Sequence, residues 1–321
     1  MTGPPVQVVA VTPNPAIDWT LEVPGFAAGR VNRVRAEHSR AAGKGVNVAA
    51  ALAGHGVRAA ATGFLGRDNA APFEALFARA GIRDAFVRVA GATRVGIKVA
   101  DPAGQQTTDL NFPGLAPGPE ATRALLETVA ELAAGEPRPW FVLAGSLPPG
   151  VDPGLYRELA LALRAAGCPV VVDAGGEPLR HALDAAPAVV KPNVHELEAL
   201  LGEPLPDAAA VLRAARGLLA RGVELAVVSM GEEGALFAAV GEAVLAVPPR
   251  VEVRSTVGAG DAMVAGIVAG RLRRLPLAEV ARLATAFSLD ALTRAPEAGA
   301  TPAAVERWAA EVRVEELPRA P

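Results

Sequence analysis

The sequence of 321 residues contains very little cysteine and histidine. Cys168 is the only cysteine, which excludes a disulfide within the chain and a cysteine-rich metal site, and is typical of a protein from a reducing compartment. The four histidines have no partners that the sequence identifies, so neither a zinc site nor a histidine-based triad is indicated. The chemistry of this protein is therefore expected to depend on other residue types.

Strong net charge and long apolar runs are missing as well. A net charge of −3 gives no electrostatic reason to expect a nucleic acid or an anionic membrane as a partner. No uninterrupted apolar run reaches the length of about 18 residues that a membrane-spanning helix needs, and the first residues do not resemble a signal peptide. We expect a cytoplasmic protein that must bind any anionic ligand through local groups.

Aromatic residues make up only 4% of the chain, whereas 51% of it is hydrophobic, mainly alanine, valine and leucine. Such a composition suits a parallel sheet that is buried under helices. The length favours one large core with a small appendage over two large domains. We therefore treat residues 1–321 as a single domain.

Apolar strands and helices alternate through the middle of the chain. An apolar run at 6–11 predicts a first buried strand, and later strands are predicted at 140–144, 169–173, 188–190 and 225–229. Strand, loop and helix in alternation predict an α/β fold with a doubly wound, mostly parallel sheet and helices on both faces. Ligands of such sheets bind at the carboxyl ends of the strands.

Four segments alternate apolar and polar residues instead, at 19–23, 31–38, 93–99 and 105–112. They predict strands with one wet face, and the last two predict a hairpin. We expect a separate small sheet that is inserted at about 18–39 and 92–113 and forms a lid on the core. Arg94 and Lys98 are evenly spaced, so they share one face and either bind an anion or are solvated surface residues.

The stretch Gly258, Ala259, Gly260 and Asp261 stands directly before an uncharged run of helical length. Free N–H groups and the helix dipole at such a helix start bind phosphate, and glycines allow the phosphate to approach. Asp261 in the first turn can accept the proton of an attacking hydroxyl group. An ordinary turn with a helix-capping acid is the alternative interpretation.

Lysine occurs only three times, and Lys44 lies between two glycines at a second loop-to-helix junction. An ammonium group and backbone N–H groups there can face an anion, although a solvated surface turn has the same composition. Asp18 follows the end of a strand, where ligand-contacting residues gather and where solvated turn acids are equally common.

Asn193 and Glu196 are three residues apart and share one face of a predicted helix start. Such a pair can hold water around a magnesium ion that is bound mainly by phosphates. The alternative is a capping box, with Asn193 as the N-cap and Glu196 as its partner. The two interpretations are compatible.

With these residues in view, the sequence resembles the PfkB, or ribokinase-like, family of carbohydrate kinases, from Thr12 to about Thr293. The most specific motif is the stretch from Ser255 to Asp261. The resemblance implies a ribokinase-like fold with Asp261 as the catalytic base. It further implies an anion hole made by the N–H groups of Val257 to Gly260, ATP as the phosphoryl donor, and Mg²⁺.

The resemblance also implies which residues bind each ligand. The positions that match a sugar-phosphate site are Asp18, Gly43, Lys44, Asn47, Arg94, Lys98 and Asn111. Those that match an ATP site are Lys191, Asn193, Ser229, Gly231, Gly234, Thr256 and Val257. Glu196 and Asn193 match the positions that hold Mg²⁺ through water. All three lysines of the chain fall in these matched motifs.

Within the family the chain looks similar to the group of 1-phosphofructokinases and tagatose-6-phosphate kinases, and Arg94, Lys98 and the segment 108–112 look closer to the former. The implied reaction is phosphoryl transfer from ATP to O6 of fructose 1-phosphate. A kinase of tagatose 6-phosphate or fructose 6-phosphate, a nucleoside or other sugar kinase, and a non-catalytic sugar-phosphate sensor are the alternatives. We expect a homodimer formed through the second face of the small sheet.

Overall fold

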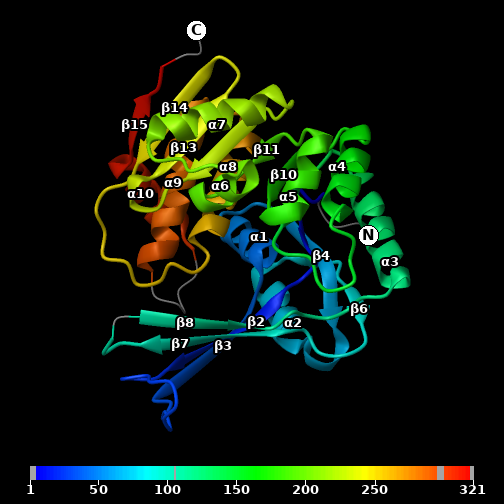
Figure 1. Cartoon of the computed structure of the whole chain (residues 1–321). Helices are drawn as coiled ribbons and strands as arrows, with labels where there is room; N and C mark the ends of the chain where they lie inside the picture. Colours follow the sequence, from blue (N-terminus) through cyan, green and yellow to red (C-terminus); the bar gives the residue numbers. More distant parts are fainter. Residues whose placement is uncertain (1–4, 105, 295–299, 319–321) are drawn as a thin grey trace.

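The computed structural model of the protein describes residues 5–104, 106–294 and 300–318, which form two β-sheets and their covering helices (Figure 1). The large sheet has the strand order β15-β14-β13-β12-β11-β10-β9-β1-β4-β5, with β6 beside β4. The small sheet has the order β3-β2-β7-β8 and lies apart from the large one. The predicted α/β fold class, a mostly parallel sheet under helices with a separate small sheet, is confirmed.

The parallel part of the large sheet consists mainly of short apolar strands that are buried on both faces, with one exposed and one half-buried strand at its edge. Val9 and Val11 pack on one face, and Val8 and Ala10 pack on the other. The parallel strands are β1 (Val8–Thr12), β4 (Ala59–Gly66), β5 (Arg83–Asp84), β6 (Val87–Val89), β9 (Trp140–Ala144), β10 (Val170–Asp173), β11 (Val189–Val190) and β12 (Leu225–Ser229).

Helices cover both faces of this sheet. One face is covered by α3 (Pro119–Ala133), α4 (Leu155–Ala165), α5 (Gly176–Ala182), α6 (Val194–Leu201) and α7 (Ala208–Ala220). The other is covered by α1 (Lys44–Gly54), α2 (Ala71–Ala80), α8 (Ala259–Leu272), α9 (Leu277–Thr293) and α10 (Pro302–Glu311). No helix within the described ranges is both long enough and apolar enough to span a membrane.

The uncharged run after Asp261 forms α8, which is buried from Asp261 to Gly270. Its glycines allow α9 to approach closely, because a Cβ atom on Gly266 would lie 2.6 Å from the Cα atom of Ala284. This close packing explains why the run lacks charge and bulk. The start of α8 is thereby held firmly at the edge of the parallel strands.

Three antiparallel strands extend the large sheet, and the patterns above do not predict them. They are β13 (Ala235–Ala239), β14 (Glu242–Val247) and β15 (Arg313–Glu316). Gly241 adopts a φ of 81° in the turn that joins β13 to β14. That glycine between two apolar runs is the signal from which the hairpin could have been found.

The small sheet contains β2 (Ala16–Glu22), β3 (Ala36–Ala42), β7 (Val95–Asp101) and β8 (Gln106–Asn111). The strand predicted at 31–38 begins only at Ala36, which pairs with Glu22 at the end of β2. The prediction for 31–35 is wrong because β2 ends at Glu22, whose carbonyl accepts from the Arg35 N–H group at 2.8 Å, and Asn32 instead bonds the backbone of Ala27. Gln105, at the start of the predicted hairpin strand, lies outside the described residues.

Candidate active site

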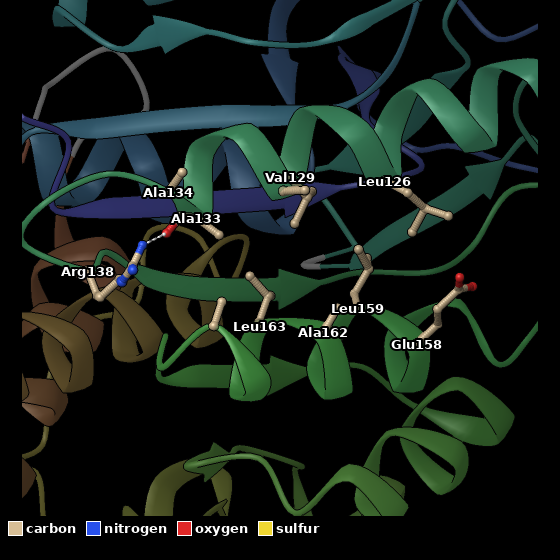
Figure 2. Close-up of a pocket in the computed structure, with 11 residues that line it drawn as sticks. Leu126, Val129, Ala133, Ala134, Arg138, Glu158, Leu159, Ala162 and Leu163 are labelled. Atoms are coloured by element: carbon tan, nitrogen blue, oxygen red, sulfur yellow. Dashed lines mark hydrogen bonds between the residues drawn. The ribbon is translucent and has the colours of Figure 1, made fainter.

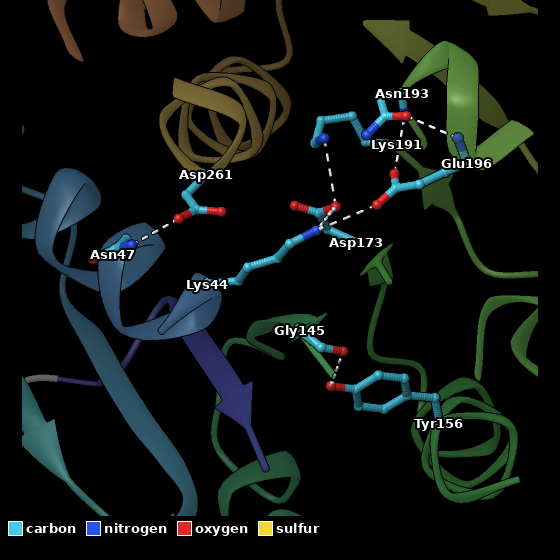
Figure 3. Close-up of polar contacts among 9 residues, drawn as sticks. All are labelled: Lys44, Asn47, Gly145, Tyr156, Asp173, Lys191, Asn193, Glu196 and Asp261. Atoms are coloured by element: carbon cyan, nitrogen blue, oxygen red, sulfur yellow. Dashed lines mark hydrogen bonds and ion pairs between the residues drawn. The ribbon is translucent and has the colours of Figure 1, made fainter. Parts of the chain in front are cut away.

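The predicted site residues that belong to the core meet at the carboxyl ends of the parallel strands, beside the first turns of α1 and α8 (Figure 3). Figure 3 shows Lys44 and Asn47 on α1, Asp261 on α8, and Lys191, Asn193 and Glu196 around the start of α6. Residues from distant parts of the chain thus converge where ligands of open α/β sheets bind.

Asp261 lies in the first turn of α8, after the N-cap Gly258, whose φ of 81° is left-handed. Its side chain is almost fully buried, with 7% of the residue exposed, and the Asn47 amide donates to its carboxylate at 2.7 Å. Burial, together with the negative charge of Asp173, raises the pKa of Asp261 to about 6. A carboxylate of this basicity is suited to accept a proton from a hydroxyl group near neutral pH.

The loop before Asp261 leaves some of its backbone N–H groups available. The N–H group of Val257 donates to Ser255 Oγ at 3.2 Å, and that of Ala259 makes a long contact of 3.5 Å with the carbonyl of Thr256. In the described part of the chain, the N–H groups of Gly258 and Gly260 have no acceptor. The anion site implied for Val257 to Gly260 therefore centres on the two glycines.

Asp173, which the sequence patterns do not single out, ends β10 at the centre of the site. Its side chain has no exposed area, and one oxygen, Oδ1, lies 3.0 Å from Lys44 Nζ and 3.4 Å from Lys191 Nζ. An acid directly after a buried apolar strand was the available signal, the same one that drew attention to Asp18.

Lys44, the first residue of α1, faces two carboxylates. Its ammonium group bonds Asp173 and lies 3.9 Å from Glu196 Oε1. Burial favours the neutral amine, but the charges of Asp173 and Glu196 outweigh it and raise the pKa of Lys44 above its ordinary value. Lys44 therefore stays positively charged, and its ammonium group is paired with a buried carboxylate instead of lying free in a solvated surface turn.

Asn193 and Glu196 form the capping box of α6. Asn193 Oδ1 accepts from the Glu196 N–H group at 2.8 Å, and Glu196 Oε2 accepts from the Asn193 N–H group at 2.9 Å. The capping interpretation is thus correct, and the second Glu196 oxygen still faces Lys44. Among the residues that the structure describes, no group of three or more metal-ligating side chains is present.

The loop after β12 lies next to this capping box. Ser229 at the end of β12 pairs with Asn193 as an isolated bridge, which places the two predicted ATP-site segments side by side. Gly231 and Gly234 have φ angles of 62° and 96°. A Cβ atom on Gly234 would lie 2.0 Å from the carbonyl oxygen of Ala246, so only glycine fits there.

A cavity of about 790 Å³ opens beside Lys44 and Glu196. Its wall includes Asn14, Arg94 and Ser146, but Lys98 is absent from the described residues that line it. Lys98 Nζ instead lies 3.3 Å from an oxygen of Asp109 on the neighbouring strand. Arg94 and Lys44 therefore border the same cavity in this structure, and Lys98 is set further out on the small sheet.

Asn14 joins the two sheets and was also missed by the sequence patterns. Its amide donates to the Pro113 carbonyl at 3.1 Å and to Ser146 Oγ at 3.2 Å. The Arg94 guanidinium donates to the carbonyls of Asn14 and Phe112, both at 3.2 Å, and burial lowers the pKa of Arg94. This junction holds the small sheet at the rim of the cavity.

Asp18 and Asn111 lie on one face of the small sheet, on either side of Gly96 in β7. A Cβ atom on Gly96 would lie 3.2 Å from Asp18 Oδ1 and 3.5 Å from Asn111 Oδ1, so both polar side chains crowd over this glycine. Lys98 is two residues further along β7, on the same face. The polar face predicted for this sheet is present.

A second hollow, of about 350 Å³, lies between α3 and α4 (Figure 2). It is lined mainly by apolar side chains such as Leu126, Val129 and Leu159. Its Arg138 already donates to the carbonyl of Ala133 at 2.8 Å. This hollow lacks converging groups for an anion and is not the candidate site.

A buried basic carboxylate, two lysines and a glycine-rich helix start at the strand ends define a phosphotransferase site of an α/β enzyme. The chain belongs to the pfkB family of carbohydrate kinases, whose family model matches residues 8–297. The recognition made from the sequence motifs is confirmed.

Individual relatives agree with this assignment. The chain is 51% identical to the 1-phosphofructokinase of Rhodobacter capsulatus over 289 residues. This alignment covers 89% of this chain and 90% of that protein. It is 38% identical to the 1-phosphofructokinase of Escherichia coli K12, over 90% and 91% of the two chains. The structure of phosphofructokinase-2 from Escherichia coli in complex with substrates and products is similar with a TM-score of 0.88, at 30% identity and over 95% and 99% of the chains.

Proposed function

We propose that this enzyme transfers the γ-phosphoryl group of ATP to O6 of fructose 1-phosphate and produces fructose 1,6-bisphosphate and ADP. The observation that carries the proposal is the buried Asp261, whose pKa is raised to about 6 at the glycine-rich start of α8. The relatives named as 1-phosphofructokinases support the choice of fructose 1-phosphate. Kinases of tagatose 6-phosphate or fructose 6-phosphate are the closest alternatives.

In this proposal Asp261 accepts the proton of the attacking hydroxyl group while that oxygen bonds to the γ-phosphorus. Asn47 donates to one Asp261 oxygen at 2.7 Å and so fixes the orientation of the carboxylate. The N–H groups of Gly258 and Gly260, at the positive end of α8, stabilise the charge that develops on the transferring group. Positioning and electrostatics supply the catalysis, as in other phosphoryl transfers.

The residues on the nucleotide side fit a magnesium ion that is held mainly by phosphates. Mg²⁺ in kinases takes one or two carboxylates, waters and phosphate oxygens, and Glu196 Oε1 is a carboxylate oxygen outside the capping bonds. Glu196, with Asn193 beside it, would hold the ion through water. The bound ion would supply positive charge to the ATP phosphates, next to Lys191 and Lys44.

On the sugar side, Arg94 and Lys44 border the cavity of about 790 Å³, and Asp18, Lys98 and Asn111 lie on the small-sheet face. We assign the phosphate of the substrate to the basic residues and its hydroxyl groups to Asp18, Asn111 and Asn47. Lys98 would exchange Asp109 for the substrate phosphate, because a doubly charged phosphate attracts an ammonium group more strongly than one exposed carboxylate does. Closure of the small sheet as a lid would then exclude water.

The second face of the small sheet supports a homodimer in the proposed enzyme. Trp19 on β2 pairs with Ile97 on β7, which pairs with Leu110 on β8, so three apolar side chains form a row on this face. Trp19 is 37% exposed and Leu110 is 51% exposed. Burial of this row against a second copy would remove apolar surface from water. As an ATP-dependent sugar kinase, the protein is expected in the cytoplasm.

The proposal is tested by an ATP-dependent assay on fructose 1-phosphate, fructose 6-phosphate and tagatose 6-phosphate with the purified protein. Preference for fructose 1-phosphate by at least about tenfold in kcat/KM is expected. The charge-removing variants Arg94→Gln and Lys98→Gln should mainly raise KM for the sugar phosphate. A nucleoside kinase would not respond to these two changes, and a sensor would show no turnover at all.

A further inference from the structure

The carboxylate of Asp173 stands between the sugar side and the nucleotide side of the site. Lys44 reaches it from the start of α1, and Lys191 reaches it from the segment between β11 and α6. Both ammonium groups contact the same oxygen, Oδ1. Two elements from opposite halves of the chain are therefore held together by one buried atom.

The other oxygen of Asp173 has no such role. Oδ2 is buried and has no hydrogen-bond partner among the described residues, and Figure 3 shows it on the side where Asp261 lies. A buried carboxylate oxygen without a donor is costly for the fold. A neutral side chain would avoid that cost but would leave the buried ammonium group of Lys191 without its carboxylate, so the position of the Asp173 charge depends on the lysines that it holds.

We propose that Asp173 is a positioning residue that holds Lys44 and Lys191 on one oxygen and so keeps both ammonium groups from pairing with Asp261. The inference rests on the proposed function, in which Asp261 must act as an unpaired base. An ammonium group that bonded Asp261 directly would stabilise its carboxylate and weaken it as a proton acceptor. Held on Asp173, both lysines remain available for phosphate oxygens.

The charges around Asp261 agree with this division of roles. Burial and the charge of Asp173 oppose ionisation of Asp261, whereas the positive charges of Lys44 and Lys191 stabilise its carboxylate, and the net effect raises the pKa of Asp261. Glu196 lies 3.9 Å from Lys44 Nζ on the other side of that ammonium group. From α9, which packs on α8, the acid Asp290 is engaged by Arg294 at 2.8 Å. Asp173 is thus the acid that neighbours the base.

The test is the pH profile of kcat/KM for Asp173→Asn, with Asp184→Asn as the matched control. Asp184 pairs with Arg221 at 2.9 Å on the surface and lies outside the site. The acid limb is the part of the profile in which kcat/KM falls at low pH, and the plateau is its highest level. In Asp173→Asn the acid limb is expected to move to lower pH by about one unit, and the plateau is expected to fall by about tenfold or more. The control should leave the limb and the plateau unchanged.

A structural role alone would lower the amount of folded enzyme without moving the acid limb. The inference would be overturned if the folded Asp173→Asn variant kept the acid limb of the wild type. This holds also if the variant needed more Mg²⁺ but its acid limb did not move. Absence of sugar-kinase turnover in the wild type would instead reject the proposed function itself. The two failures are therefore distinguishable.

If Asp173→Asn does not fold, the double variant Asp173→Asn with Lys191→Met replaces it. The double variant removes the buried ion pair as a unit and is expected to fold. Lys44 remains in this variant and is no longer held by Asp173, so it can pair with Asp261, and the acid limb is expected at lower pH than in the wild type, with a lowered plateau. A double variant with the wild-type plateau would contradict the inference, because neither Asp173 nor the lysine it holds would matter.

Discussion

Replacement of Asp261 by asparagine is expected to stabilise the folded protein at neutral pH while it removes turnover. The carboxylate is buried, and its pKa rises from an ordinary value of 3.8 to about 6 on folding. The folded state therefore holds a proton more tightly than the unfolded chain does. Stability that this group provides at low pH is lost as pH rises from about 4 to about 6, and it stays lost above that range.

The size of the effect follows from the shift. Two pKa units correspond to about 3 kcal/mol, which is the expected gain for Asp261→Asn at pH 8, and the gain should shrink to about 0.5 kcal/mol near pH 4. Asparagine has nearly the shape of a protonated aspartic acid, and its oxygen can still accept from Asn47. The variant should therefore differ from the wild type chiefly in charge.

The assay is denaturant unfolding of both proteins between pH 4 and pH 8, with Asp184→Asn as a control for a surface carboxylate. The wild type and Asp261→Asn are expected to converge at low pH and to separate as pH rises. A difference in unfolding free energy that did not change with pH would refute the reasoning. It would show that Asp261 has an ordinary pKa in the folded protein.

Further predictions concern other parts of the molecule. Gly234→Ala should destabilise the protein by more than about 2 kcal/mol, because the added Cβ atom would meet the Ala246 carbonyl. Gly217→Ala is the matched control in the same unfolding assay. It should stabilise α7 by about 0.5 kcal/mol, because nothing lies within 4 Å of the added Cβ atom. Asn193→Ala should lower the unfolding free energy by about 1 kcal/mol and raise KM for ATP, and an unchanged value of both would contradict the capping geometry. Leu110→Lys should turn a dimer into a monomer in sedimentation, and an unaffected dimer would place the interface elsewhere.

Much of the fold could be predicted because it depends on local patterns. Continuous runs of β-branched residues such as Val170 to Val172 are typical of strands that are buried on both faces, and the structure has them so. The antiparallel β13 and β14 escaped prediction because short alanine-containing apolar runs fit a buried helix segment as well as a strand. Residues 31–35 alternate like a strand, but the pairing with β2 ends at its last residue, Glu22, which only the register reveals.

The site was predictable to the extent that its chemistry is carried by motifs in the chain. Asp261 and Lys44 stand beside glycines at helix starts, and the structure brings them together. Asp173 and Asn14 could not be found in the same way, because their roles depend on contacts with Lys191 and Ser146, which are far away in the sequence. Such contacts become visible only when the strand ends are placed side by side.

The central claim is that Asp261 is the base of a sugar-phosphate kinase, and turnover of the Asp261→Asn enzyme tests it most directly. With saturating ATP and Mg²⁺ and a range of fructose 1-phosphate concentrations, the wild type should form fructose 1,6-bisphosphate, with kcat/KM falling about tenfold per pH unit below pH 6. The folded variant is expected to lose at least about 1000-fold in kcat while it still binds both substrates. A variant with near-normal turnover would contradict the account.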